Sequence, residues 1–275
     1  MRKMIFMRFP EGRAKALTFS YDDNVRENIR LIQIFNRYGM KATFNINSGL
    51  YPQDDSHLRM MSKDEMTKLF DENSPHEVAI HSHTHPFLAA LPIVAATEEL
   101  LCDRQCLEEQ FHRIVRGMAY PNNSYNDEIV SAARSCGIVY ARTTDSTERF
   151  DLPTDWLRMP TTCHHNSPRL MELATSFVEK EAKYLPKLFY LWGHSYEFED
   201  NQNWEIIERF TSYMGGREAE IWYATNIEIY EYVEAYHRLI FSADCKTVKN
   251  PTSITLWFSY NKQLISILPN QTLNL

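Results

Sequence analysis

Short apolar runs alternate with amphipathic segments along most of the chain. Apolar residues at helical spacing, such as Val25, Ile29, Ile32 and Phe35, indicate helices between the runs. The runs that predict buried strands are 16–20, 41–46, 77–80, 117–120, 138–141, 157–160, 188–192 and 220–224. The segments that predict helices are 25–38, 98–115, 126–137 and 203–213. Seven or eight strand–helix units in roughly 240 residues predict an α/β fold whose parallel sheet closes into a (β/α) barrel.

Local sequence signals mark where several helices begin. Ser62 with Glu65, and Thr225 with Glu228, have the spacing of a capping box, in which two side chains bond reciprocally to free backbone N–H groups. Asn126 is predicted to cap the helix that ends near Gly137. Ser167 followed by Pro168 predicts another helix start, with proline at the first helical position.

The pattern changes after Arg238. Ile254, Leu256, Phe258 and Tyr260 alternate with other residues, as in a half-buried antiparallel strand. We therefore expect two parts: a barrel over residues 1–238 and a small β-rich extension over 239–275 that packs on it.

Composition and charge exclude several classes of function and partner. The net charge of −7 argues against nucleic-acid or anionic-membrane partners, which select basic surfaces. Arg8 interrupts the first apolar stretch, and no apolar run approaches the ~18 residues needed to span a bilayer, so we expect a cytoplasmic protein. The five scattered cysteines fit a reducing compartment. Cys102 and Cys106 are expected to be neighbours on one helix face rather than a metal site.

Candidate chemistry is concentrated directly after the predicted strands, where barrel enzymes place their reacting groups. Six of the ten histidines fall in these short windows. The windows are Tyr21–Asp23, His81–Pro86, Tyr120–Asn123, Thr161–His165 and Gly193–Glu197.

The first two windows offer ligands for a metal ion. Imidazole and carboxylate groups are good zinc ligands, and three histidines occur in five residues from His81 to His85. Pro86 disfavours helical geometry at His85, which excludes the helical histidine pair of a zincin protease. On an extended backbone the adjacent Asp22 and Asp23 would point to opposite sides, so that one binds a cation and the other faces the substrate.

Three motifs together resemble the polysaccharide deacetylases, also called the NodB-homology domain or carbohydrate esterase family four. They are Asp22-Asp23 after Leu17-Thr18-Phe19, His81-Ser82-x-x-His85, and Trp192-x-His194, and the resemblance covers roughly residues 14–235. It implies a distorted parallel (β/α) barrel. It also implies one divalent metal ion, with Zn²⁺ the first choice and Co²⁺, Ni²⁺ or Mn²⁺ the alternatives.

The same resemblance assigns roles to individual residues. Asp22 would be the general base and His194 the general acid, while Asp23, His81 and His85 would bind the metal. The implied reaction is hydrolysis of an acetyl group, expected as N-acetyl, from a carbohydrate such as an N-acetylglucosamine-containing saccharide. The residues expected on the substrate side are Trp192, Tyr120, Pro121, Tyr125, Tyr196, His164 and His165. A backbone N–H at or near Tyr120 is expected to help hold the oxyanion.

The chain departs from the family pattern at three positions. Asn24 stands where the family has glycine, and Trp192 where it has a leucine that lines the acetyl pocket. Ala119 occupies the position of the arginine that holds the base, and neither Arg116 nor Arg158 matches that motif position.

Two other functions stay open. An amidohydrolase-like barrel would use His81 and His83 as its ligand pair, although that pair normally follows the first strand rather than the third. A catalytically silent carbohydrate-binding module would keep the barrel without the chemistry. Because a binder needs no general acid, His194 argues against it.

Overall fold

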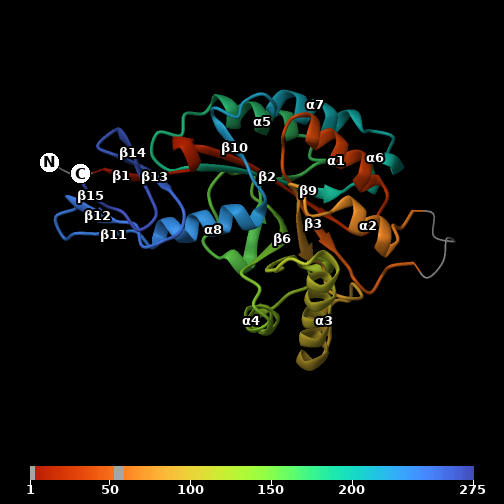
Figure 1. Ribbon diagram of the computed structural model, residues 1–275. Coiled ribbons are helices and arrows are strands. Elements are labelled where there is room, and N and C mark those ends of the chain that lie inside the picture. Colours follow the sequence, from red (N-terminus) through yellow and green to blue (C-terminus); the bar gives the residue numbers. More distant parts are fainter. Residues whose placement is uncertain (1–3, 53–58) are drawn as a thin grey trace.

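The computed structural model describes residues 4–52 and 59–275, and its centre is a parallel sheet that curls almost into a barrel (Figure 1). The predicted α/β barrel is thereby confirmed. Residues 1–3, the beginning of the first apolar stretch that Arg8 interrupts, lie outside the described residues. The strands of the barrel are β2 (Lys15–Asp22), β3 (Thr43–Ile46), β4 (Glu77–Ile80), β5 (Gly117–Ala119), β6 (Tyr140–Ser146), β7 (Met159–Thr161), β8 (Cys163–His164), β9 (Lys187–His194) and β10 (Ile221–Tyr223). Their order is β7-β6-β5-β4-β3-β2-β9-β8, and β10 also pairs with β2.

One short stretch of chain closes the sheet on itself. β7 pairs with β6, β8 pairs with β9, and only Thr162 separates β7 from β8. The backbone N–H of Thr162 donates to the carbonyl of Tyr190 on β9 at 2.9 Å. Residues 159–164 therefore bridge the two ends of the sheet, which brings the carboxyl ends of strands far apart in sequence to one rim.

β2 is the central strand, and all eight of its residues are buried. It pairs with β9 along its whole length, so that Asp22 lies in register with His194. A strand covered on both faces carries few large polar side chains, and in β2 the apolar Leu17 and Phe19 alternate with the small, buried Thr18 and Ser20.

Eight helices are described, and they lie around the outside of the barrel (Figure 1). Phe35 of α1, for example, packs on Phe19 of β2 with ring centroids 4.4 Å apart. The helices are α1 (Glu27–Arg37), α2 (Lys63–Leu69), α3 (Ile93–Phe111), α4 (Asp127–Ser135), α5 (Leu170–Glu179), α6 (Tyr196–Asp200), α7 (Glu205–Met214) and α8 (Asn226–His237). None of the helices in the described ranges is both long and apolar enough to cross a bilayer.

The predicted helix starts are confirmed at three of four places. Ser62 and Thr225 form complete capping boxes, and the Asn126 side chain accepts from the backbone of Ile129. The start at Ser167–Pro168 is wrong, because the N–H of Leu170 turns back to the Ser167 carbonyl and α5 begins only at Leu170.

α3 is displaced from its predicted range of 98–115. It begins at Ile93, where the exposed Ile93 and Val94 gave no amphipathic signal, and it ends at Phe111. His112 follows in the left-handed region (φ 52°), which stops the helix three residues before Val115.

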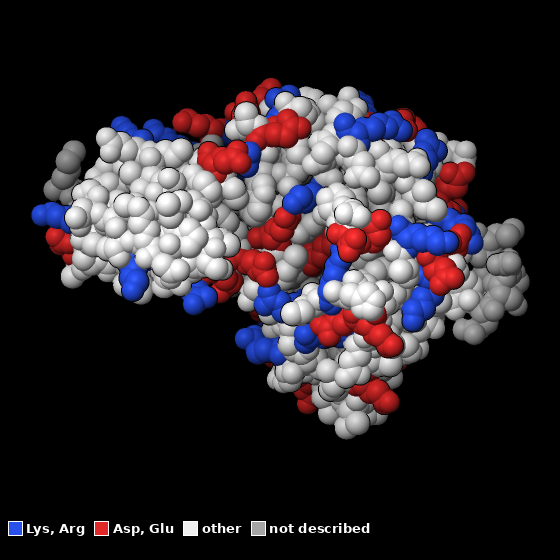
Figure 2. All heavy atoms as spheres, viewed as in Figure 1, with Lys and Arg blue, Asp and Glu red and all other residues white. Residues whose placement is uncertain are grey.

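A small antiparallel lobe lies beside α8 and contains most of residues 239–275. It consists of β11 (Ile240–Phe241), β12 (Thr247–Lys249), β13 (Leu256–Tyr260), β14 (Gln263–Ile267) and β15 (Thr272–Asn274). β1 (Ile5–Arg8) joins it as the partner of β13, so the two ends of the chain meet here (Figure 1). In the view of Figure 2 this lobe presents a nearly uncharged face, whereas charges of both signs are dispersed over the barrel.

Candidate active site

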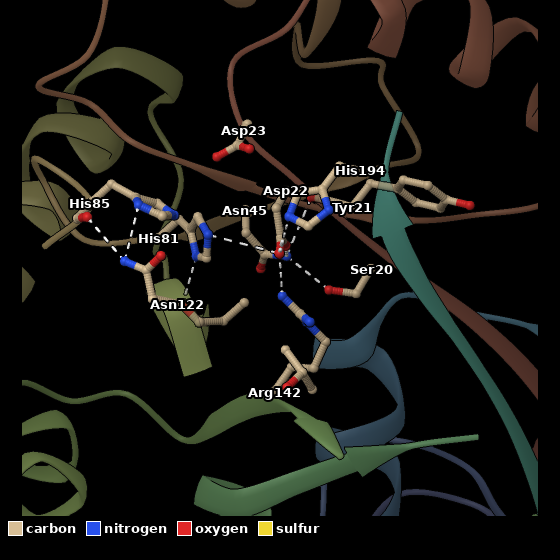
Figure 3. A network of polar contacts seen from close by, with 12 residues as sticks. Ser20, Tyr21, Asp22, Asp23, Asn45, His81, His85, Asn122, Arg142 and His194 are labelled. Atoms are coloured by element: carbon tan, nitrogen blue, oxygen red, sulfur yellow. Dashed lines mark hydrogen bonds and ion pairs between the residues drawn. The ribbon is translucent and has the colours of Figure 1, made fainter. Parts of the chain in front are cut away.

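Asp22 lies at the centre of a buried polar network at the carboxyl end of β2 (Figure 3). Its Oδ2 accepts a hydrogen bond from Nη2 of Arg142, and its Oδ1 accepts one from Nδ2 of Asn45 at 2.7 Å. Nε2 of His81 and Nε2 of His194 lie 3.8 and 3.7 Å from the same Oδ2. The proposed base and the proposed acid are therefore neighbours across β2 and β9.

The surroundings keep Asp22 ionised. Burial by itself would raise the pKa of this carboxyl, but the Arg142 guanidinium, followed by His81 and His194, lowers the pKa to about 2. At neutral pH the site therefore contains a desolvated carboxylate.

Arg142 supplies the charge that the sequence motif lacks at Ala119. It lies on β6 directly opposite Ala119 of β5, and its side chain is buried. Its guanidinium also lies over the Trp192 ring, 4.4 Å from the centroid. The two arginines compared with that motif position in the sequence analysis form ion pairs elsewhere. Arg116 pairs with Glu231, and Arg158 pairs with Asp127 and Asp155.

Asp23, His81 and His85 form a group that fits a metal ion. One donor atom from each lies within 4.8 Å of the others. Nδ1 of His81 donates to the carbonyl of Ala119 at 2.8 Å, which fixes the ring and leaves Nε2 to face the cluster. Such an outer hydrogen bond accompanies most metal-binding histidines. One carboxylate and two imidazoles are a donor set suited to a catalytic divalent cation with open positions.

Left-handed backbone conformations shape this cluster. Asp23, Ser82 and His85 have φ values of 76°, 61° and 57°, which non-glycine residues adopt rarely and at a cost of about 1–3 kcal/mol each. Asp23 is therefore not extended, so the opposite orientation that an extended backbone would give to Asp22 and Asp23 does not apply here. The turn there brings both carboxylates toward His81 (Figure 3).

Buried side chains hold the histidine loop in place. The Asp103 carboxylate on α3 accepts the N–H groups of Ser48 and His81 at 2.7 and 2.9 Å. Nδ2 of Asn47 donates to the carbonyls of His81 and Ser82 at 2.6 and 2.8 Å. Asn24, in place of the family's glycine, is buried and makes two hydrogen bonds with the Asn47 backbone.

Glu197 gathers the histidines on the other side of Asp22. Its Oε1 lies 2.8 Å from Nδ1 of His194, and its Oε2 lies 3.0 Å from Nε2 of His165 and 3.4 Å from Nε2 of His164. The His165 ring packs so closely on Gly193 that a Cβ there would lie 2.1 Å from Nδ1. The structure thus brings His164 and His165 to the rim beside the proposed acid.

This arrangement favours a protonated His194. Burial lowers the pKa of His194, but the hydrogen bond to Glu197 and the charge of Asp22 outweigh it, and the pKa is raised overall. Burial would raise the pKa of Glu197, and its contacts with His164, His165 and His194 hold it well below the usual range. Burial lowers the pKa of His165 to about 4, so this ring is neutral.

Aromatic residues line the same rim. The Trp192 ring is buried between Arg142 and His164, 4.6 Å from the His164 centroid. Tyr196 packs on His194 with centroids 5.2 Å apart, and the Arg59 guanidinium lies 5.3 Å from the centre of the Tyr196 ring.

Tyr120, Tyr125 and Pro121 follow β5. Tyr120 stacks on Tyr125 with centroids 4.7 Å apart, and Pro121 is buried in the turn after it. The backbone N–H of Tyr120 donates to the carbonyl of Arg142 at 3.1 Å. The sheet therefore already uses the N–H of Tyr120 itself, and a neighbouring backbone N–H as the oxyanion donor stays a prediction.

His83 lies outside the cluster around Asp22. Its Nδ1 is 2.9 Å from Oγ of Ser48, and its neighbours are Cys102 and Cys106. The ligand pair that an amidohydrolase-like site would need, His81 with His83, is thus divided between two places.

Four residues of the network had no assigned role from the sequence: Asn45, Asp103, Arg142 and Glu197. Glu197 could have been predicted from the sequence, since it lies three residues after His194 in the same window. Asn45 is the next-to-last residue of the second strand run, close to the rim where functional residues are expected. Arg142 and Asp103 depend on strand pairing and helix packing, which no local pattern indicates.

Fold and site together define an α/β barrel with a carboxylate–histidine cluster at the carboxyl ends of its strands. Sequence comparison adds a family likeness: the family model for polysaccharide deacetylase matches residues 10–141. Residues 10–141 are therefore similar to the polysaccharide deacetylase family. This confirms the resemblance predicted from the motifs at Asp22–Asp23 and His81–His85.

Individual relatives agree with this family. YxkH of Bacillus subtilis (strain 168), a protein assigned to the polysaccharide deacetylases, is 26% identical over 135 residues. That match spans 48% of this chain and 45% of YxkH, so less than half of the relative is represented.

Solved structures show the same fold. A Mycobacterium smegmatis protein assigned to the polysaccharide deacetylases has a TM-score of 0.61 at 15% identity, covering 84% of this chain and 94% of that one. The Xyl-CE4 domain of a multidomain xylanase from the hindgut metagenome of Trinervitermes trinervoides has a TM-score of 0.55 at 14% identity, covering 81% and 92%. At these identities the likeness concerns the fold alone.

Proposed function

We propose that this protein is a metal-dependent hydrolase that removes an acetyl group, as an N-acetyl amide, from a carbohydrate such as an N-acetylglucosamine-containing saccharide. The observation that supports it most is the position of Asp22, a buried carboxylate between His194 and the Asp23–His81–His85 group. A base, an acid and a set of metal ligands at one strand end are what amide hydrolysis requires.

Asp23, His81 and His85 are the proposed ligands of one divalent cation, Zn²⁺ or else Co²⁺, Ni²⁺ or Mn²⁺. When bound, such a cation supplies a Lewis acid that polarises the acetyl carbonyl and acidifies water. The reaction forms a bond between the water oxygen and the carbonyl carbon and breaks the carbon–nitrogen bond, giving acetate and an amine.

The chain's own residues move the protons. The Asp22 carboxylate takes a proton from the attacking water, and because its pKa is about 2 it releases that proton readily. His194, held at Nδ1 by Glu197, presents Nε2 toward Asp22 and gives a proton to the leaving nitrogen. Without that proton an amine leaves slowly. On the substrate side, Trp192 is proposed to bound the acetyl group, and Tyr120, Pro121, Tyr125, Tyr196, His164 and His165 to contact the saccharide.

An acetate-release assay tests this function. The purified protein is incubated with acetylated chito-oligosaccharides, acetylated xylan and small acetylated sugars, each with Zn²⁺, Co²⁺, Ni²⁺ or Mn²⁺ added. We expect release from an N-acetylated saccharide, and a loss of about 10²–10⁴-fold in Asp22→Asn with the metal content unchanged. The matched control is Asp127→Asn, since the Asp127 side chain is 98% exposed on α4 and should tolerate the change. No release with any metal, or full activity of Asp22→Asn, would contradict the proposal.

A further inference from the structure

We propose that His83, Cys102 and Cys106 form a second metal site, separate from the Asp23–His81–His85 group, which binds a thiophilic divalent cation such as Zn²⁺. One nitrogen of His83 and the two sulfurs lie within 4.8 Å of one another. The proposal does not depend on the deacetylase activity.

The two cysteines share one face of α3. They lie one helical turn apart, at positions i and i+4, so their side chains project to the same side. Both are partly exposed free thiols, so an ion in solution can reach them. On the sequence alone this pair lacked a third ligand.

The loop after β4 supplies that third ligand. The backbone N–H of His83 donates to the carbonyl of Glu99 on α3 at 3.2 Å, which places the loop one turn before Cys102 and Cys106. The neighbouring Thr84 bonds twice to the Glu99 carboxylate, at 2.7 Å each. His83 is therefore fastened to the helix turn that precedes the cysteines.

The His83 ring is itself held in one orientation. Nδ1 lies 2.9 Å from Oγ of Ser48, which leaves Nε2 as the nitrogen available to a cation. A Cβ at position 49 would lie 2.8 Å from Nε2 and 2.6 Å from the His83 carbonyl oxygen, so only glycine allows this approach. A histidine fixed through its other nitrogen is the usual arrangement at metal sites.

The ligand chemistry distinguishes this site from the first. Two thiolates and one imidazole select Zn²⁺ and other borderline or soft ions over Mg²⁺ and Ca²⁺. Asp23, His81 and His85 offer one oxygen and two nitrogens and no sulfur. Because His83 lies between His81 and His85, an ion at the second site would also tie the histidine loop to α3.

Cobalt binding tests the proposal through the sulfur ligands. Metal-free full-length protein is titrated with Co²⁺ in the presence of a phosphine reductant, and the near-ultraviolet sulfur-to-cobalt charge-transfer band is followed. We expect this band in the wild type and in Asp23→Asn, and its loss in Cys102→Ser and Cys106→Ser. Cys245→Ser is the matched control, since Cys245 is a partly exposed free thiol in the C-terminal lobe.

A second measurement needs no variant. In the wild type, Zn²⁺ should slow alkylation of Cys102 and Cys106 by about tenfold or more, because a zinc-bound sulfur is not free to attack. Alkylation of Cys245, followed by peptide mass spectrometry, should not change. A missing sulfur band, a band that persists without both thiols, or equal alkylation with and without Zn²⁺ would overturn the second site. None of these readouts uses acetate release.

Discussion

The guanidinium of Arg142 and the carboxylate of Asp22 form an ion pair between strands 120 positions apart in sequence. Three strands separate β6 from β2 in the sheet order, so the pair crosses the interior of the barrel. The two side chains are 1% and 3% exposed, which removes both charges from solvent. The pair therefore links the closure of the barrel to the charge state of the proposed base.

Replacing Arg142 by glutamine should damage both stability and activity. Removing one partner of a buried ion pair leaves an uncompensated charge and typically costs about 3–5 kcal/mol. With Arg142 absent, burial raises the pKa of Asp22, so the acidic limb of the pH profile of kcat/KM should move to higher pH. Urea unfolding and pH–rate profiles measure the two effects. Arg158→Gln removes a surface arginine with two carboxylate partners and should leave the profile unchanged.

Glu197→Gln should shift the alkaline limb instead. The Glu197 carboxylate raises the pKa of His194, so its removal should lower that pKa and deprotonate the proposed acid at lower pH. The alkaline limb of kcat should then move to lower pH, with a small change in KM. Glu172→Gln, which removes a carboxylate paired with Arg169 on the surface, is the control. An alkaline limb at the wild-type pH would remove Glu197 from the control of His194.

Asp103→Asn should change how stability depends on pH. Burial raises the pKa of Asp103 to about 7, although hydrogen bonds from Ser48 and His81 oppose this. An unfolded aspartate titrates near pH ~4, so between about pH 4 and 7 the folded state holds a proton that the unfolded state releases. The free energy of unfolding should therefore fall as the pH rises through this window, and less steeply in the variant.

The same substitution should also lower stability throughout. An amide NH₂ in place of one oxygen leaves a backbone N–H without an acceptor, which costs about 1–3 kcal/mol. Chemical unfolding at several pH values measures both effects. Burial also raises the pKa of Glu77 to about 7, so Glu77 contributes to the pH dependence in both proteins. Subtracting the unfolding free energy of the variant from that of the wild type at each pH leaves the contribution of Asp103. If the unfolding free energy of the wild type and of the variant depended on pH in the same way, the raised pKa of Asp103 would be contradicted.

Trp192→Leu should broaden acyl selectivity. The indole ring lies against the Arg142 guanidinium and the His164 ring, in the position proposed to limit the acyl group. A smaller side chain should admit propionyl and butyryl groups, measured as kcat/KM relative to acetyl. If the ring instead stacks on a sugar, KM alone should rise and the acyl preference should stay the same.

The barrel was predictable because its strands are buried on both faces. The run 188–192 is short and continuously apolar, and the run 16–20 is interrupted only by the small hydroxyl residues Thr18 and Ser20, which is typical of strands covered on both sides. The capping boxes at Ser62 and Thr225 act over four residues, so the local sequence contains them completely. α3 was harder to place, since its first turn is exposed and carries no amphipathic signal.

In the site too, residues in local motifs were predictable and residues placed by tertiary structure were not. Asp22, Asp23, His81, His85 and His194 follow strand ends in recognisable motifs, and the structure gathers them. Arg142 was missed because its strand was expected to end at Ala141 and because its register against Ala119 depends on how β5 pairs with β6. Pairing between strands is a tertiary property, which the sequence of one strand does not contain.

The partnership of β1 with β13 has a consequence for biosynthesis. Met4 and Asn261, bonded at the end of this pair, are 257 positions apart. At ~5–20 residues per second a ribosome needs roughly 10–50 s to make the intervening chain. For most of that time β1 lacks β13, its partner among the described strands, although β2, β3 and β4 are already synthesised. The β1–β13 pair can therefore form only after residues 256–260 have been synthesised, so this part of the lobe assembles later than the strands at the centre of the barrel can begin to pair.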